Sequence, residues 1–456
     1  MERRTFINAA IFGTILPFSE SIAGSLISKE KGVVEPERTI PIAGVYDVIV
    51  CGAGPAGIAA AIESGRNGAK TLLIEVHGCL GGVWTAGNLT WILDNQNKSG
   101  LISEIKRDLA KLAGQGTIES GPSYAFDAEV MKVILETYCV EANVDVRLHT
   151  RVVSTAVKDG RLTHVMTESK SGREAWAARI FVDCSGDGDL AMQAGCKYEY
   201  GGPQGEGQPM SLLALVSGVS YEQIKPFVRD AEDSKVKSPS KKRLEAEIIR
   251  SGVKPSYSLP GLYPIRNDLY MLMANHEYGY VGFDAKQISI ATLKARAEVH
   301  QIVNGLRSLG GIWQNLRIIS TAEQIGVRES RRIHGLYTVS ANDIMEGIRH
   351  KDAVCRVTFG VDVHSVKKDD ENKQVYNRGI KAIPYDIPIR ALIAKDVKGL
   401  MMAGRCISGD FIAHSSYRVT GNAVVMGEAA GRLAAIAAGS NRLPQEVDWA
   451  EVKWNI

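Results

Sequence analysis

The sequence is poor in cysteine, and its cysteines are not paired at the spacing of a metal or redox site. There are seven of them in 456 residues, an odd number scattered along the chain, and no Cys-x-x-Cys occurs. A disulfide framework or a zinc site is therefore not expected, and we predict no metal. An excess of one charge is also missing, because the formal net charge is only +3. Charge thus gives no indication of a nucleic-acid or membrane-surface partner.

A long apolar run is missing as well. A membrane-spanning helix needs ~20 consecutive apolar residues, whereas the apolar run that ends at Phe18 is shorter and lies at the N-terminus. It follows Arg3-Arg4 and precedes Ser21-Ile22-Ala23, which places small residues where a signal peptidase reads. This pattern resembles a twin-arginine export leader, a route for proteins that are already folded. We expect a periplasmic or otherwise exported protein with no integral membrane segment in the mature chain. It would be cytoplasmic if residues 1–24 are not a leader.

The strongest positive signal lies between Tyr46 and Glu75. An apolar run is followed by Gly52-x-Gly54-x-x-Gly57, an Ala- and Ile-rich segment, a second apolar run and then the acid, which is 75 − 57 = 18 residues after the third glycine. In a dinucleotide-binding unit the first glycine permits the turn, the second lets backbone approach a pyrophosphate and the third lets the helix pack on the sheet. An acid ~20 residues further on meets a ribose hydroxyl. The complete order predicts a bound dinucleotide, against the alternative of an ordinary glycine-rich turn.

Two later glycine-bearing segments are expected near the same ligand. Four glycines occur in the ten residues 78–87, so the backbone there is expected to approach something flat or charged, and a flexible surface loop is the alternative. The apolar strand at 180–182 opens into an acidic loop around Gly186, whose N–H could face a nucleotide. A calcium loop is not expected, because Ala194 stands where the bidentate Glu is required.

Periodicity predicts the elements between these loops. Helical spacing covers 100–113, and Asp127 has the character of an N-cap for a helix through Asn143. Short apolar runs at 144–148, 151–157 and 162–167 predict an inserted β-meander. Residues 221–249 are expected to be a charged helical region whose basic run 241–243 is solvated, and 288–309 one amphipathic helix.

Two stretches carry polar groups suited to a substrate. If 326–335 is a strand, Arg328 and Arg332 share one side, where an arginine would clamp a carboxylate or another anion. The alternative is a structural arginine paired with Glu323 or Glu329. In the C-terminal stretch, His414 is the candidate general acid or base, with Arg418 as a second anion clamp. A packed structural imidazole is the alternative for this histidine.

The helix expected after this stretch has small residues along one face, including Gly427 and Gly431. Such a face indicates close packing on a sheet or on a cofactor. The helix opens at Gly421-Asn422, and its positive N-terminus could stabilise negative charge on a reduced flavin.

Six motifs carry a resemblance to a known family. In order they are GAGPAGIAAAIESGRNGAKTLLIE, LGGVWTAG, DCSGDGDLA, RESRRIHGLYTV, YDIPIRALI and MAGRCISGDFIAHSSYRVTGNAVVMGEAAG. Together they resemble the FAD-dependent oxidoreductase family of glutathione-reductase-like flavoproteins over most of residues 45–440. The resemblance departs at Cys79, which lacks the second cysteine of the disulfide reductases, so dithiol chemistry is not expected. The lack of a second glycine fingerprint argues against a tightly bound NAD(P)H domain.

The resemblance implies FAD and a set of contacts along the chain. The ADP half would lie on the first glycine loop and its acid, the flavin side on 81–85, the pyrophosphate also near 404–405 and the pyrimidine edge over 421–423. The expected FAD contacts are Gly52, Ala53, Gly54, Pro55, Ala56, Gly57, Glu75, Gly81, Gly82, Thr85, Val153, Gly186, Asp187, Gly404, Arg405, Gly421, Asn422 and Ala423.

The fold expected is α/β: a Rossmann-like FAD-binding domain with a parallel sheet, an inserted meander and helices, and a second α+β substrate or cap domain. The expected boundaries are 1–24 leader, 25–44 linker, 45–196 and 376–440 FAD-binding domain, 197–375 substrate domain and 441–456 tail. The expected function is hydride transfer between FAD and a small organic substrate, with His414, Arg418 and Arg328 as catalytic residues and an unidentified electron acceptor. The alternatives are a flavin monooxygenase and a non-catalytic or electron-transfer flavoprotein subunit.

Overall fold

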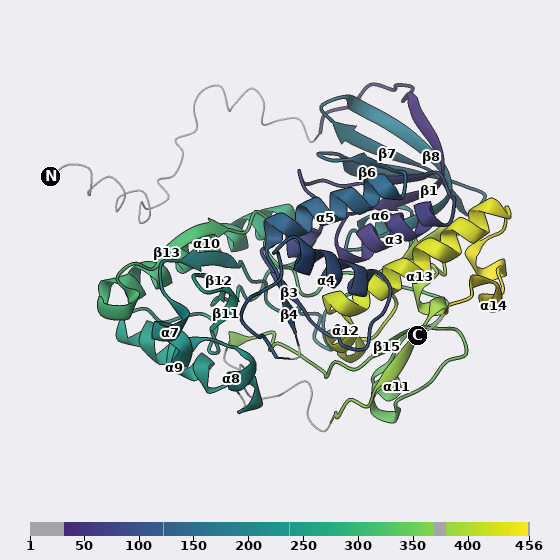
Figure 1. The fold of residues 1–456 in the computed structure, drawn as a ribbon. Helices are drawn as coiled ribbons and strands as arrows, with labels where there is room; N and C mark the ends of the chain where they lie inside the picture. The colour runs from purple at the N-terminus through teal and green to yellow at the C-terminus, as the bar shows by residue number, and fades with distance from the viewer. Residues whose placement is uncertain (1–31, 122, 237, 369–379, 455–456) are drawn as a thin grey trace, which may run out of the picture. The chain divides into compact units, whose positions relative to one another are not determined.

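The largest sheet has seven strands in the order β5-β2-β1-β8-β7-β6, with β17 also beside β8. Its strands β1, β6, β7 and β8 are labelled in Figure 1. The computed structural model describes residues 32–121, 123–236, 238–368 and 380–454. The predicted export leader lies outside them, and Pro41–Ile456 form a unit distinct from Met1–Ile40. The strands are β1 (Ile42–Cys51), β2 (Thr71–Ile74), β5 (Val144–Arg147), β6 (Arg151–Lys158), β7 (Arg161–Ser169), β8 (Gly172–Asp183) and β17 (Leu400–Met402).

Parallel pairing brings the ends of three strands together. β1 pairs in parallel with β2 and β8, so that Cys51 lies opposite both Ile74 and Asp183. β17 pairs in parallel with β8, which sets Met402 beside Asp183. The predicted meander is confirmed for β6 and β7, which pair antiparallel with each other and, through β7, with β8. Its first predicted run, 144–148, is wrong as a meander strand, because β5 pairs in parallel with β2. The glycine loops that follow β1, β8 and β17 therefore meet at one edge of the sheet.

Two helices far apart in sequence pack closely beside this sheet. They are α3 (Pro55–Arg66) and α13 (Thr420–Gly439), purple and yellow in Figure 1. A Cβ at Gly427 would lie 2.1 Å from the Ala56 carbonyl oxygen, and one at Gly431 would lie 2.1 Å from that of Ala60. The small face of α13 therefore packs on a helix, whereas the sequence led us to expect a sheet or a cofactor.

The middle of the chain builds a second sheet with its own core. The order is β11-β12-β10-β13, all antiparallel, and a hydrophobic cluster that includes Leu244, Tyr270, Ile302 and Trp313 lies against it. Its elements are β10 (Ala214–Ser217), α7 (Tyr221–Ile224), α8 (Ala231–Lys235), α9 (Pro239–Arg250), β11 (Gly261–Arg266), β12 (Leu269–Met273), α10 (Ala285–Ser308) and β13 (Arg317–Thr321). The mixed α/β class and the α+β character of this part are as predicted.

Short elements complete the described part of the chain. They are η1 (Gly82–Trp84), β3 (Trp91–Ile92), α4 (Leu101–Lys111), β4 (Tyr124–Ala125), α5 (Ala128–Glu141), α6 (Asp189–Gln193), β9 (Tyr198–Glu199), η2 (Lys225–Phe227), η3 (Gly311–Trp313), β14 (Arg332–Ile333), α11 (Ala341–Glu346), β15 (Ala353–Val357), β16 (Tyr385–Pro388), η5 (Ile389–Leu392), α12 (Phe411–Tyr417), η6 (Pro444–Glu446) and α14 (Trp449–Val452).

Three local predictions can be compared with these elements. Asp127 caps α5 as expected, because its side chain accepts from the Glu129 N–H. The region 221–249 is not continuous but is divided among α7, η2, α8 and α9. The predicted strand through Arg328 is wrong: only Arg332–Ile333 are strand, and the residues before them form a loop.

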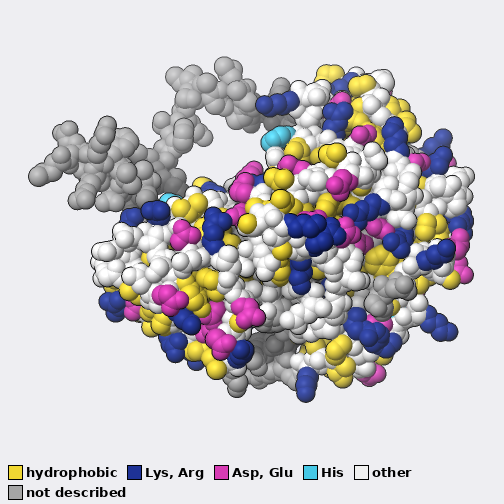
Figure 2. All heavy atoms as spheres, viewed as in Figure 1, with side chains coloured by type: hydrophobic (Ala, Val, Ile, Leu, Met, Phe, Trp, Pro, Cys, Tyr) yellow, Lys and Arg dark blue, Asp and Glu magenta, His cyan; other side chains and the backbone are white. Residues whose placement is uncertain are grey.

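No helix in the described residues is long and apolar enough to cross a membrane. On the face shown in Figure 2, Lys and Arg side chains are interspersed with Asp and Glu, in keeping with the small net charge.

Glu428 joins α13 to the start of α4 and gives a pH-dependent stability. Its carboxylate accepts from the Leu101 N–H at 2.8 Å, and burial raises its pKa to about 8. Because this pKa is higher in the folded protein than in the unfolded chain, the contribution to stability is complete below about pH 4.5 and is lost as pH rises to 8.

We expect Glu428→Gln to prevent the loss of stability at high pH, because glutamine resembles the protonated glutamic acid. The variant should gain about 1–3 kcal/mol in free energy of unfolding over the wild type at pH 8.5 and little at pH 5. Denaturant unfolding of the FAD-loaded protein at both pH values measures the difference. The exposed Glu141→Gln is the control, and equal effects of the two variants would contradict the assignment.

Candidate functional site

The glycine loop after β1 contains two glycines that the protein itself requires. Gly52 has φ +96°, and a Cβ there would lie 2.5 Å from the carbonyl oxygen of Cys184. At Gly57, a Cβ would lie 1.7 Å from the Gly52 carbonyl oxygen. Close approach of the loop to the end of β8 and of α3 to the loop therefore excludes any side chain at these positions.

Gly54, between them, has no such requirement from the protein. A Cβ at this position would meet no atom within 4 Å, and its φ of −66° is available to any residue. It is the N-cap of α3, with Pro55 in the first turn. Helix N-terminal N–H groups and the helix dipole favour a phosphate at such a position. The geometry fits a dinucleotide pyrophosphate that passes where a side chain would project.

Glu75 reaches the glycine loop from the end of β2. Its carboxylate accepts from the Ala53 N–H at 2.6 Å and from the His77 N–H at 2.9 Å, and the residue is 5% exposed. A carboxylate has further lone pairs for a ligand hydroxyl. The structure thus places the acid beside the predicted nucleotide position, and its contact with a ribose stays a prediction.

The second glycine segment lies directly against the first. The Gly81 N–H donates to the Ala53 carbonyl at 2.8 Å, and a Cβ at Gly82 would lie 2.9 Å from the Gly54 Cα. Thr85 is fixed by a 2.5 Å hydrogen bond to the Leu80 carbonyl, and Trp84 is fully buried. The alternative of a flexible surface loop does not fit this packing.

The loops after β8 and β17 are joined by an ion pair. The Arg405 guanidinium lies 3.0 Å from the Asp187 carboxylate and donates to the Val327 carbonyl. A Cβ at Gly186 would lie 2.3 Å from the same guanidinium. Burial raises the pKa of Asp187 to about 6, and the neighbouring Arg405 opposes this shift. Any pyrophosphate contact of Arg405 would have to share the guanidinium with this aspartate.

The remaining predicted contacts lie at the start of α13 and in β6. Gly421 packs on the loop after β3, because its N–H donates to the Leu93 carbonyl at 3.0 Å. Asn422 is fully buried, and its Nδ2 has no hydrogen-bond partner in the described residues. A buried amide donor of this kind is satisfied by a bound polar group, which fits a flavin edge. Ala423 follows in the same turn, and Val153 lies half-buried in β6.

α12 carries two of the predicted catalytic residues. The His414 side chain is fully buried, and neither ring nitrogen has a partner among the residues described. Burial lowers the pKa of His414 well below its usual range, and Arg332, Arg418 and Arg405 lower it further. The imidazole is therefore neutral at pH 7. The Arg418 N–H donates to the His414 carbonyl at 3.2 Å, one helical turn away.

The third predicted residue, Arg328, approaches the same region from a loop. Its Nη1 donates to the Pro209 carbonyl at 2.7 Å and to Ser211 Oγ at 2.8 Å. Among the described residues it has no carboxylate partner, whereas Arg332 pairs with Glu329 and Arg331 with Asp189. The structural alternative considered for these arginines therefore applies to Arg332 but not to Arg328.

Several residues around these side chains carried no recognisable sequence signal. Gln208 Oε1 accepts from the His364 N–H at 2.9 Å and lies 3.5 Å from Arg418 Nη2. Arg418 Nη2 donates a hydrogen bond to the Asp362 backbone carbonyl at 2.8 Å. The Asp362 carboxylate lies 3.3 Å from His364 Nε2. These residues come from separate loops, so only the tertiary structure brings them together. The described residues contain no group of three or more side chains suited to a metal.

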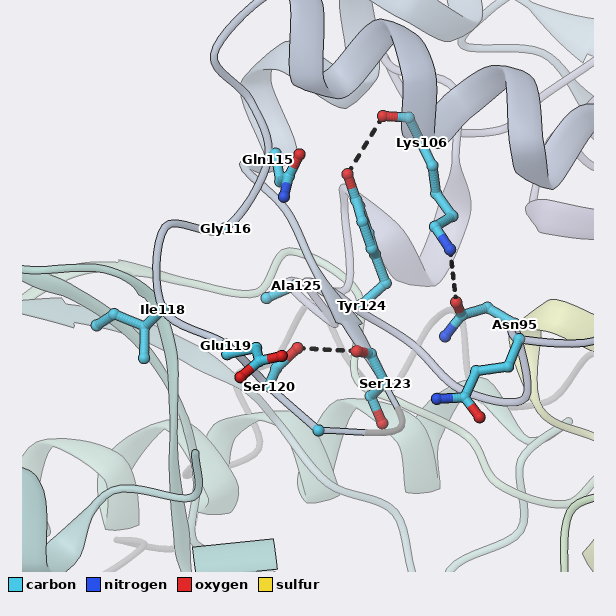
Figure 3. A pocket seen from close by; sticks show the side chains of 12 residues that line it. Asn95, Lys106, Gln115, Gly116, Ile118, Glu119, Ser120, Ser123, Tyr124 and Ala125 are labelled. Carbon is cyan, nitrogen blue, oxygen red and sulfur yellow. Dashed lines mark hydrogen bonds between the residues drawn. The ribbon is translucent and has the colours of Figure 1, made fainter. Parts of the chain in front are cut away.

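A separate pocket of about 210 Å³ lies beside α4. Lys106 Nζ donates to Asn95 Oδ1 at 3.2 Å, and Tyr124 OH donates to the Lys106 carbonyl at 3.2 Å (Figure 3). The lining contains none of the predicted site residues, so this pocket is distinct from the site described above.

The fold and the glycine loop together define a dinucleotide-binding protein of the Rossmann-like flavoprotein type. Residues 47–456 match the family model described as FAD dependent oxidoreductase, and the chain belongs to this family. It is an FAD-dependent oxidoreductase, and its cofactor is FAD. The position at Gly54 where a Cβ would contact no protein atom, and the Asn422 Nδ2 that has no partner among the described residues, agree with that cofactor.

Solved structures show only distant likeness, and no curated protein matches. A geranylgeranyl bacteriochlorophyll reductase-like protein from Thermoplasma acidophilum is 14% identical, with 90% of this chain and 82% of that chain covered and a TM-score of 0.49. The flavin-dependent brominase Bmp2 is 14% identical, with 90% of this chain and 82% of that chain covered and a TM-score of 0.46. The p-nitrophenol 4-monooxygenase PnpA from Pseudomonas putida DLL-E4 is 9% identical, with 90% of this chain and 83% of that chain covered and a TM-score of 0.46. These values support no conclusion about substrate.

Proposed function

We propose that this enzyme transfers a hydride between FAD and a small organic substrate that binds beside His414, Arg418 and Arg328. The observation that carries the proposal is the fully buried His414, whose ring nitrogens have no partner in the described residues. His414 lies one helical turn from Arg418. The chain belongs to a family that uses FAD. A buried polar side chain without a partner is uncommon and is satisfied when a ligand binds.

The chain contributes position and charge to this reaction. Bound FAD supplies a two-electron acceptor or donor. The loops at 52–57 and 81–85 would hold it, and the N-terminus of α13 would favour negative charge on the reduced form. His414, neutral at pH 7 because of burial and the nearby arginines, is able to accept a proton from the substrate. Arg418 and Arg328 would orient a negatively charged group.

An anaerobic visible spectrum of the purified holoprotein tests the proposal. It is repeated after addition of hydroxy acids, amines, sugars and NAD(P)H. Loss of the oxidised flavin absorbance with one organic class supports a dehydrogenase. Loss with NAD(P)H alone would contradict it in favour of a monooxygenase or reductase, and no loss at all would favour an electron-transfer or structural role.

We also propose that the enzyme belongs with the glutathione-reductase-like flavoproteins, which is supported by the order of the six motifs. It would lack their dithiol chemistry. The seven cysteines are free in the structure, and Cys79 contacts Thr85 Oγ1 at 3.6 Å rather than a second thiol.

Export through the twin-arginine route is a further proposal, supported by Arg3-Arg4 and the apolar run after them. Replacement of both arginines by lysine is expected to retain the FAD-loaded protein in the cytoplasm, because this route reads the arginine pair. Fractionation and immunoblotting of the native host check this. Unchanged export of the lysine variant, with a cytoplasmic marker protein as the control, would contradict the proposed leader.

A further inference from the structure

We infer that the substrate is a hydroxy acid whose carboxylate is bound by Arg328 and Arg418 and whose hydroxyl contacts His414. This inference rests on the proposed hydride transfer and names its substrate class. Four features of the described residues support it: uncompensated positive charge, the position of the two guanidinium groups, their spacing from His414, and the protonation of that histidine.

The first feature is the charge on Arg328. Its hydrogen bonds go to neutral acceptors, the Pro209 carbonyl and the Ser211 hydroxyl. The partner of Nη2 within the described part of the chain is the Met273 sulfur at 4.0 Å. Burial, with a smaller contribution from the neighbouring Arg418, lowers the pKa of Arg328 to about 10, and Tyr257 and Asp362 oppose this shift. Arg328 is partly buried and, among the described residues, has no carboxylate within ion-pair distance, so an anionic ligand at this position would stabilise it.

Arg418 is only partly compensated. Its Nη2 lies 3.6 Å from the Asp362 carboxylate, but that carboxylate is 51% exposed and also lies 3.3 Å from His364. The Nε of Arg418 is buried and has no partner in the part of the chain described. The other nearby acid, Glu329, is already paired with Arg332. Two guanidinium groups therefore share one half-exposed carboxylate.

Two consecutive residues, Gln208 and Pro209, contact the two arginines. Arg328 binds the carbonyl of Pro209, and Arg418 lies 3.5 Å from the side chain of the preceding residue, Gln208. The Gln208 amide donates to Ser415 Oγ at 3.1 Å, and Ser415 follows His414 in α12. The arginine pair and the histidine therefore belong to one connected set of contacts.

The spacing along α12 suits a small bifunctional molecule. His414 and Arg418 are four residues apart in or next to one helix, so they lie on the same face with Cβ atoms ~5–6 Å apart. The carboxylate and hydroxyl of a hydroxy acid can reach both side chains at once. A neutral alcohol would leave the arginines uncompensated, and an amine would add a further positive charge.

The protonation of His414 also favours an anionic substrate. Burial, followed by the positive charges of Arg332, Arg418 and Arg405, lowers the pKa of this histidine. A carboxylate bound at Arg418 would offset part of that positive field and make proton acceptance easier. In the oxidation direction the hydroxyl proton passes to His414, the carbon gives its hydride to FAD, and the C–O bond becomes the carbonyl of a keto acid.

Calorimetric titration of the wild-type holoenzyme under anaerobic conditions tests the inference with matched ligands. Lactate represents a short hydroxy acid and gluconate a sugar acid, while lactamide and sorbitol are their uncharged counterparts. We expect at least one acid to bind ten-fold or more tightly than its uncharged counterpart. The acid that binds more tightly shows whether the site prefers a short hydroxy acid or a sugar acid. This comparison needs no variant. Equal or tighter binding of both uncharged ligands would overturn the inference.

Substitution of Arg328 gives a second measurement. Arg328→Met is expected to weaken binding of the acid by about 100-fold, since truncating one partner of a buried charge pair has an effect of this order. The affinity for the uncharged ligand should not change. Arg328→Lys keeps the charge but not the planar fork, so it should lose about ten-fold. Arg317→Met, an exposed arginine on β13, is the control, and an equal loss in this variant would contradict the assignment.

The binding assay and the flavin spectrum separate failure of this inference from failure of the proposed function. If alcohols or amines reduce the flavin and neither acid binds, the hydroxy-acid inference is wrong and hydride transfer stands. If an acid binds in a manner that depends on Arg328 but no compound reduces the flavin, the anion site is supported and the hydride-transfer proposal fails.

Discussion

A Gly54→Val variant is expected to fold normally and to lose FAD. A Cβ at this position would meet no protein atom within 4 Å, and the backbone, with φ −66°, accepts any residue. It would instead occupy the space where the pyrophosphate approaches the first turn of α3. We expect FAD to bind on the order of 100-fold more weakly, which corresponds to about 2.7 kcal/mol.

Two measurements on the purified variant separate binding from folding. Absorbance at flavin wavelengths reports the FAD retained, and thermal unfolding of both proteins after removal of FAD reports the fold. Gly439→Val is the control, because a Cβ at that exposed glycine also meets nothing within 4 Å. Full flavin content in the Gly54 variant would show that the cofactor does not pass this position.

Gly431→Leu is expected to destabilise the whole unit. A Cβ at this position in α13 would lie 2.1 Å from the carbonyl oxygen of Ala60 in α3, and backbone atoms cannot move aside as a flexible side chain can. The two helices would have to separate, with loss of the core between them. We expect the free energy of unfolding to fall by 3 kcal/mol or more, at or above the upper range for overpacking.

Denaturant unfolding of the FAD-loaded protein measures this effect, with Gly439→Leu as the matched control on the same helix. The control should change stability by less than about 0.5 kcal/mol, as is usual for an exposed position. A small effect of Gly431→Leu would mean that α3 and α13 do not pack as closely as the structure shows. If the variant yields no folded protein, Gly431→Ala provides a smaller substitution for the same measurement.

Local pattern was sufficient wherever the physical cause is local. The order of strand, glycine loop, helix, strand and acid in residues 46–75 follows from short-range sterics and helix-end chemistry. It was confirmed as β1, α3 and β2. Short apolar runs separated by turn residues predicted the antiparallel pair β6 and β7, and Asp127 was correctly predicted as the N-cap of α5.

Local pattern failed where distant partners decide the conformation. The loop at Arg328 alternates like a strand, but before Arg332 its pairing is limited to one isolated bridge between Gly326 and Ser211. Lys241, expected on a solvated helix face, is half-buried, whereas the next two basic residues are exposed. The small face of α13 indicated close packing but could not identify α3 as the partner, because nothing in a helix specifies which surface it will meet.

The sequence by itself determined the cofactor class and the likeness to FAD-dependent oxidoreductases, because each of the motifs that carry them lies within a short segment. Only the tertiary structure brought Gln208, Arg328, Asp362 and Arg418 into one group of contacts. The tertiary structure also distinguished Arg332, which is paired with a glutamate, from Arg328, which is not. The physical reason is that charge compensation depends on distances between side chains from separate loops, and a sequence records order along the chain but not those distances.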